Sequence, residues 1–280
     1  MVLAIRCYDP FTCCCFLRRQ AFEDLVKEMM PCGLKVMTIS PAVDARDGYA
    51  RLRVLLAEGV MPSLGHDRKC SVGDILGAMR VAAAHGVQCH VTHLFNVCGF
   101  HHRNPSLVNF GLTSRFPKQP EYEGLASPTV EVITDLKHVH PLTIAAVLSS
   151  RDIRDLVTIT DSVLAPKRGA RLSYNGRTMV VAQDCKAVYL EGTETLAGSC
   201  CSMLAAFNNL IRVVGATVAE ASQMLATNPA RIAGLGHAGA IAVGKRADIV
   251  CFSTGGLPRG NHSKLWLETT IIAGKVAYRL

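Results

Sequence analysis

The feature that most constrains the fold of this chain is a series of short apolar runs. Each run is followed by a polar residue of a type that can bind a metal or transfer a proton. Three of these runs, residues 60–64, 89–91 and 156–160, lead into His66, His93 and Asp161 respectively. Continuous apolar runs of this length are typical of buried strands in a parallel sheet. The residue after such a strand lies at its carboxyl end, where α/β barrels place their chemistry. The sequence therefore predicts that these three side chains share one rim of a parallel sheet.

Segments with helical spacing separate the apolar runs. Strands are expected to begin near Lys35, Val60, Cys89, Val130 and Leu156, which spaces them by about 25 to 40 residues, as in βαβ units. Helices are expected at residues 21–30, 47–57, 71–84 and 141–150, and a loop rich in proline and polar residues at 107–123. The pattern predicts an α/β fold built on a parallel sheet.

The pattern changes after Asp161. Residues 172–189 are interpreted as short strands, Leu196–Ser199 as a tight loop, and residues 201–214, 218–226 and 229–235 as helices. Two further strands, at 247–252 and 269–278, are expected to form a small C-terminal β element. We therefore divide the chain into an unassigned N-terminus at 1–20, a barrel portion at 21–237 and strands of a small β-sandwich domain at 238–280.

Composition excludes several classes of function. The net charge is +8, but the basic residues are scattered, so no nucleic-acid partner is expected. No run approaches the roughly 20 apolar residues that span a bilayer, so no membrane association is expected. Most of the 12 cysteines lie singly inside apolar runs, which favours free thiols and a cytoplasmic location. No signal peptide is expected, since the first residues include Arg6 and Asp9.

The three strand-end residues suit metal-assisted hydrolysis. Neutral imidazoles bind Zn²⁺ or Fe²⁺, and a catalytic site needs about three protein ligands. A nearby carboxylate can take a proton from water and pass it to a leaving amine. One histidine alone would more simply be a core or loop residue, but three strand ends in series favour a site.

Three further residues are candidates for substrate binding. Arg103 could bind a phosphate or lie free on the surface. His138 follows the fourth predicted strand, so it could face the same rim or serve as a helix cap. Asn96 could bind a sugar or phosphate oxygen, or cap its loop.

These motifs together make the chain resemble the N-acetylglucosamine-6-phosphate deacetylases of the amidohydrolase superfamily, over about residues 21–280. The matching segments are Gly65-His66, Thr92-His93-Leu94-Phe95-Asn96, Phe100-His101-His102-Arg103, His138-Val139-His140-Pro141, Thr160-Asp161, Leu196-Ala197-Gly198-Ser199 and the tail at 239–250. The tail is common to many amidohydrolases, whereas the segments around His93 and Arg103 are more specific. A dihydroorotase-like enzyme is disfavoured for that reason.

The resemblance implies a partial TIM-like (β/α) barrel with the equivalents of strands four to eight. His66 and His93 would be ligands of a divalent metal, zinc or iron, and Asp161 the general base and acid. Asn96 and His138 would bind the sugar phosphate, and Arg103 would reach the phosphate, across the interface of a homodimer. The implied reaction converts N-acetyl-D-glucosamine 6-phosphate into D-glucosamine 6-phosphate and acetate.

Two parts of the family pattern do not occur in this sequence. They are the His-x-His of the first barrel strand and the glutamate ligand of the third. The alternative is therefore a truncated, inactive relative or a gene-model fragment. Smaller departures are Cys98 where the family usually has methionine, and Leu136 and Ser106 where it usually has glycine.

Overall fold

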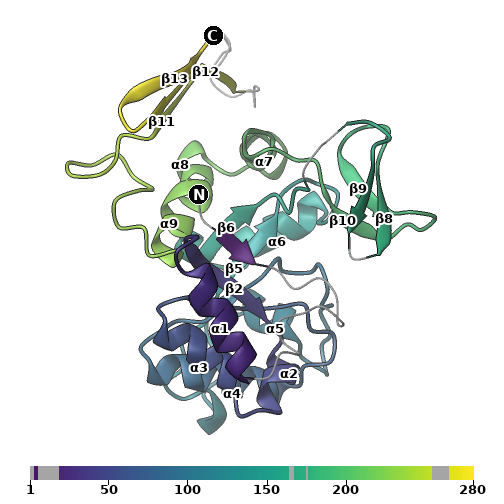
Figure 1. Cartoon of the computed structure of the whole chain (residues 1–280), viewed down its shortest axis with the longest axis vertical. Helices are drawn as coiled ribbons and strands as arrows, with labels where there is room; N and C mark the ends of the chain where they lie inside the picture. Colours follow the sequence, from purple (N-terminus) through teal and green to yellow (C-terminus); the bar gives the residue numbers. More distant parts are fainter. Residues whose placement is uncertain (1–2, 6–18, 164–166, 175, 254–264) are drawn as a thin grey trace.

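The computed structural model describes residues 3–5, 19–163, 167–174, 176–253 and 265–280. Its strands form a six-stranded, a four-stranded and a three-stranded sheet (Figure 1). None of the helices in the described ranges has the length and the apolar composition that crossing a lipid bilayer requires.

The central sheet is parallel, and its six described strands follow chain order. They are β1 (Leu3–Ile5), β2 (Leu34–Ile39), β3 (Met61–Leu64), β4 (His90–Val91), β5 (Thr129–Ile133) and β6 (Leu156–Ile159). The five predicted strands and the partial-barrel class are confirmed. The sequence did not predict β1, because three residues are too few to show a period. It falls within residues 1–20, of which 6–18 lie outside the described part of the chain.

Helices connect the strands, as the spacing predicts. They are α1 (Arg19–Met29), α2 (Pro41–Ala45), α3 (Ala50–Ala57), α4 (Val72–Ala84), α5 (Leu107–Leu112) and α6 (Pro141–Ser150), with 3₁₀ turns at Pro120–Tyr122 and Ile153–Asp155. The predicted loop at 107–123 is wrong over α5. Ser106 caps that helix by accepting a hydrogen bond from the Val108 N–H, and Asn109 completes a capping box. This role accounts for a serine at position 106.

One continuous apolar core holds the sheet and its helices together. The side chains of Phe22 on α1, Leu52 on α3 and Ile75 on α4 are almost fully buried. They belong to the same cluster as Met37 and Val130 on the central strands. Burial of this kind contributes about 1.5–3 kcal/mol per large side chain, so the helices are fixed against the sheet and the strand ends are held in place.

The second sheet follows β6 and is antiparallel. Its strands are β7 (Arg171–Tyr174), β8 (Arg177–Val181), β9 (Ala187–Leu190) and β10 (Leu196–Ser199). The predicted loop at Leu196–Ser199 is therefore wrong, because this segment pairs with β9 as a strand. Its small residues allow a close approach to the chain beside Asp161, where Ser162 and Ser199 form an isolated bridge.

The rest of the chain is helical and then β-stranded. The predicted helices are present as α7 (Met203–Asn209), α8 (Val218–Ser222) and α9 (Asn228–Ile232), with π-helical turns at Leu210–Val214 and Gln223–Thr227. The small C-terminal β element is confirmed as an antiparallel sheet of β11 (Ile249–Ser253), β12 (Trp266–Ile272) and β13 (Lys275–Arg279).

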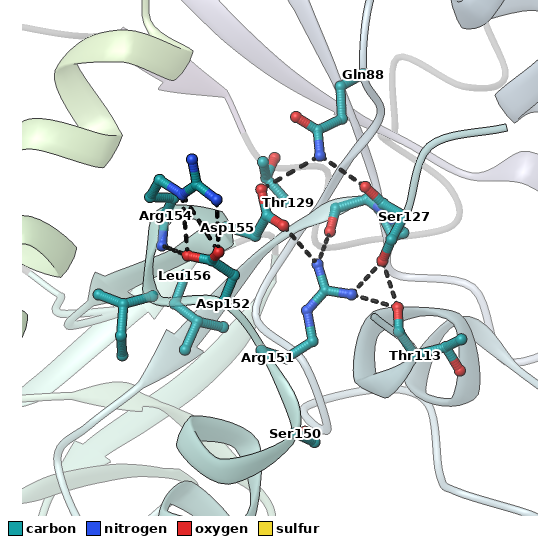
Figure 2. A network of polar contacts seen from close by, with 12 residues as sticks. Gln88, Thr113, Ser127, Thr129, Ser150, Arg151, Asp152, Arg154, Asp155 and Leu156 are labelled. Carbon is teal, nitrogen blue, oxygen red and sulfur yellow. Dashed lines mark hydrogen bonds and ion pairs between the residues drawn. The ribbon is translucent and has the colours of Figure 1, made fainter. Parts of the chain in front are cut away.

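A buried arginine organises the end of the sheet at which the strands begin (Figure 2). Arg151 donates hydrogen bonds to the carbonyls of Thr113 and Pro128 and to the Ser127 hydroxyl, and its side chain is 0% exposed. It also pairs with the Asp155 carboxylate at 3.4 Å. The starts of β5 and β6 and the end of α5 are thereby joined through one side chain.

Candidate functional site

Three strand ends bring His66, His93 and Asp161 to one rim of the parallel sheet. His66 lies two residues after β3, and His93 and Asp161 each two residues after β4 and β6. All three adopt positive φ, at 53°, 27° and 50°. Non-glycine residues rarely take this left-handed conformation, and such strain clusters at functional sites. The three candidate residues thus share one uncommon backbone conformation, which a few residues elsewhere also adopt.

The two imidazoles face each other directly. Their Nε2 atoms lie 2.7 Å apart, and the ring centroids are 4.6 Å apart with an interplanar angle of 62°. When both rings are neutral, one must donate its N–H to the other. Packing holds this pair together, because a Cβ added at Gly65 would lie 2.8 Å from Thr92 Cβ. The loop before His66 thus packs tightly against the residue before His93.

Hydrogen bonds with buried polar groups of neighbouring strands hold Thr92 and the backbone of His93 in place. Thr92 hydrogen-bonds the hydroxyls of Thr38 on β2 and Ser63 on β3. The backbone N–H of His93 donates to Glu131 Oε2 at 3.2 Å.

Glu131, in the middle of β5, and His90, the first residue of β4, are buried polar residues behind His93 that sequence reasoning missed. His90 Nε2 lies 3.3 Å from Glu131 Oε1, and His90 Nδ1 lies 2.8 Å from Thr129 Oγ1. A glutamate inside the otherwise apolar run of β5 was the available signal. A charged side chain is rarely buried there without a partner.

Asp161 is buried and reaches the loop of His93 through Asn96. Asn96 Nδ2 donates to Asp161 Oδ2 at 3.4 Å, and the Asn96 N–H donates to the His93 carbonyl at 3.0 Å. On its other side, the Asp161 carbonyl accepts the Ser199 N–H at 2.9 Å. A Cβ at Gly198 would lie 3.1 Å from that carbonyl, so only glycine permits this contact. Asn96 and β10 therefore hold the Asp161 turn from two sides.

His138 is a buried imidazole with one ring nitrogen aimed at no described partner. Its Nδ1 hydrogen-bonds Asp135 Oδ2 at 2.7 Å, and its side chain is 1% exposed. Its Nε2 has no hydrogen-bond partner among the described residues. A buried polar atom without a partner is costly, so His138 Nε2 remains a candidate for ligand contact.

Asp135 sets the orientation of His138. Burial alone would raise the pKa of Asp135, but hydrogen bonds from His138 and from the Lys137 and His138 N–H groups outweigh it and lower that pKa. An ionised Asp135 accepts the Nδ1–H of His138 and thereby fixes the orientation of the ring.

Leu136, in the same turn, has φ of 63°, which accounts for the family's usual glycine at this position. Its side chain packs against the main core, partly buried.

Arg103 lies on an exposed loop rather than with the other candidates. Its N–H donates to His101 Nδ1 at 3.2 Å, and the rings of His101 and His102 stack with centroids 4.8 Å apart. The structure thus brings His66 and His93 into contact and joins Asn96 to Asp161. His138 is buried in the turn after β5, and Arg103 lies on the surface.

The described residues do not complete a metal site. His66 and His93 supply two imidazoles, whereas a catalytic zinc needs about three protein ligands and an open position. Nowhere in the described ranges do three or more His, Cys, Asp or Glu side chains come together in a group that could hold a metal.

Comparison with known proteins gives one consistent result. The model of the amidohydrolase family matches residues 42–277. The human N-acetylglucosamine-6-phosphate deacetylase is 27% identical over 267 residues, which cover 92% of this chain and 58% of the human protein. An N-acetylgalactosamine-6-phosphate deacetylase of Escherichia coli O157:H7 is 29% identical over 227 residues, covering 79% of this chain and 54% of the relative. The chain thus spans little more than half the length of these relatives.

A solved structure shares the fold. It is a Mycobacterium smegmatis N-acetyl-D-glucosamine-6-phosphate deacetylase with an Asp-to-Ala substitution, in complex with N-acetyl-D-glucosamine 6-phosphate. It superposes with a TM-score of 0.74 at 21% identity, covering 98% of this chain and 67% of that one.

Proposed function

We propose that this chain, which belongs to the amidohydrolase family, hydrolyses the acetamide of N-acetyl-D-glucosamine 6-phosphate. The products are D-glucosamine 6-phosphate and acetate. The names of its relatives support this substrate. The single observation that carries the proposal is the rim itself, where His66, His93 and Asp161 share an unusual backbone conformation and His93 and Asp161 are joined through Asn96.

In this proposal Asp161 is the general base and then the general acid. Its carboxylate takes a proton from the attacking water and passes it to the amine that leaves. Asn96, which donates to Asp161 Oδ2, orients the carboxylate for this proton transfer. The hydrogen bond from the Ser199 N–H to the Asp161 carbonyl fixes the backbone of Asp161 during this proton transfer.

His138 is proposed to hold the sugar. Its Nδ1 is engaged by Asp135, so its Nε2 is the ring atom left to hydrogen-bond a sugar hydroxyl. Asn96 is proposed to contribute a second contact to the sugar phosphate. Arg103 is exposed, so it would reach the phosphate of a substrate bound in a second copy of the chain, as a homodimer allows.

The resemblance implies a divalent metal, and His66 and His93 are the proposed ligands of zinc or iron here. Because these two imidazoles are an incomplete set, further ligands must come from outside the described residues. We propose a cytoplasmic location, since the eight described cysteines are all free thiols.

The test is acetate release by the purified chain from N-acetyl-D-glucosamine 6-phosphate, with metal content measured in parallel. Added Zn²⁺ and Fe²⁺ are compared with a chelated sample, and N-acetyl-D-galactosamine 6-phosphate is the comparison substrate. Metal-dependent release of acetate, lost in Asp161→Asn, supports the proposal. A folded chain that binds no metal and releases no acetate would instead be an inactive relative.

A further inference from the structure

Two cysteines lie on the two loops that carry His66 and His93. Cys70 follows β3 and Cys98 follows β4, and both are half-buried. The Cys98 thiol donates to the Asp67 carbonyl at 2.9 Å, and the Cys70 thiol donates to the same oxygen at 3.5 Å. The two thiols therefore share one acceptor, the Asp67 carbonyl. Both sulfurs are thus held at one point between the loops.

Asp67 fixes that point. Its side chain is almost fully buried, and Oδ2 accepts hydrogen bonds from Ser40 Oγ and the Ala42 N–H, each at 2.7 Å. Oδ1 accepts the Lys69 N–H at 2.9 Å. Because three groups anchor Asp67, its carbonyl offers the two thiols a rigid acceptor.

We propose that Cys70 and Cys98 are a site of reversible oxidative modification, which a hydroperoxide converts into an intramolecular disulfide. One sulfur attacks an oxygen atom of hydrogen peroxide, and the O–O bond breaks. The products are a sulfenic acid on that cysteine and one water. The second sulfur then attacks the sulfenic sulfur, so an S–S bond forms and a second water leaves. Two electrons pass from the thiols to the peroxide, and a small dithiol reverses the change.

The surroundings distinguish the two sulfurs. Cys98 lines a small cavity together with His66 and His93, whereas Cys70 is not among the residues that line it. In the proposed sequence Cys98 is therefore the thiol that meets the peroxide, and Cys70 is the resolving thiol.

The disulfide would tie together the loops that carry the two imidazoles. It closes the chain between residues 70 and 98, so the oxidised protein should melt roughly 5–10 °C higher than the reduced protein. This modification does not depend on which reaction the rim performs, and its test needs no substrate.

The experiment treats the reduced, full-length chain with a small excess of hydrogen peroxide. Remaining thiols are alkylated under denaturing conditions before digestion with trypsin. Cleavage after Lys69, Arg80 and Arg103 yields peptides 70–80 and 81–103. We expect these to run as one linked species, about 2 Da lighter than their sum, which a dithiol separates.

Matched variants identify the partner of Cys70. Peptide 81–103 also contains Cys89, so Cys89→Ala must keep the linked species and Cys98→Met must lose it. Methionine is the residue that the resemblance expects at position 98, which protects the fold of this variant. Cys32 is exposed on another element and reports general oxidation. Oxidation of Cys32 while peptide 70–80 remains alkylated, or linkage of Cys70 to another cysteine, would overturn the proposal.

Discussion

The two ends of the parallel sheet differ in the residues that they carry and in how the backbone is held. Where the strands begin, the buried Arg151 side chain joins the backbone carbonyls of Thr113 and Pro128 (Figure 2). Where the strands end, His66, His93 and Asp161 have left-handed backbones. At the first end one side chain pairs with several backbone groups, whereas at the second the strained residues are the candidate functional ones. This division matches the general separation of stability and activity in α/β barrels.

The largest expected effect is on activity at the carboxyl rim. If the proposed reaction is right, Asp161→Asn should lower the rate of acetate release about 10²- to 10⁴-fold, because no carboxylate remains to move the proton. The melting temperature should change little beside this loss. Asp184→Asn, on an exposed turn, is the control and should keep its rate. Equal activity in Asp161→Asn and wild type would remove the residue from the mechanism.

At the other rim the expected effect is on stability. Arg151→Leu leaves several buried acceptors unsatisfied, so the free energy of unfolding should fall by about 3–5 kcal/mol. Chemical denaturation measures this loss.

Arg154→Leu is the matched control, because its ion pair with Asp152 is largely exposed and should change the free energy of unfolding far less than Arg151→Leu. Equal losses in the two variants would show that the amino rim is not the organising network described above.

Gly65→Ala tests whether packing holds the imidazole pair. The new methyl would lie 2.8 Å from Thr92 Cβ, so the loops of His66 and His93 must shift. We expect a loss of about 1–3 kcal/mol of stability and, if the proposed metal binds at His66 and His93, weaker metal binding measured by calorimetry. A Cβ at Gly99 meets nothing within 4 Å, so Gly99→Ala should change neither quantity. Unchanged metal binding in Gly65→Ala would separate the packing from the site.

The smallest effect concerns pH. Folding lowers the pKa of Asp135 below its ordinary value of 3.8. The ionised carboxylate therefore contributes fully to stability at pH values above 3.8. The contribution disappears as pH falls through the folded pKa. Asp135→Asn lacks this contribution, so the difference in unfolding free energy between wild type and variant should shrink below about pH 4. A constant difference from pH 7 to pH 3 would contradict the role of Asp135 as the ionised partner of His138.

Sequence reasoning located the strands because burial on both faces leaves a continuous apolar run. For the same reason it placed His66, His93 and Asp161 at the strand ends. It missed β1 because three residues carry no period, and it took β10 for a loop because small residues suit both. These errors concern segments whose structure is set by pairing with distant strands.

The support around the rim was harder to predict. The Arg151 network joins residues far apart in sequence, and nothing near Arg151 indicates carbonyl partners at 113 and 128. The contact between Cys70 and Cys98 likewise depends on the Asp67 carbonyl, which no side-chain pattern reveals. The departure at Leu136 was visible in the sequence, but its positive φ was not.

The hydrogen bond from the Ser199 N–H to the Asp161 carbonyl offers a spectroscopic handle. That amide can exchange its proton with solvent only when the turn at Asp161 opens. Its exchange rate, followed by NMR in deuterated water, would report how rigidly the carboxylate is held before any sugar is added.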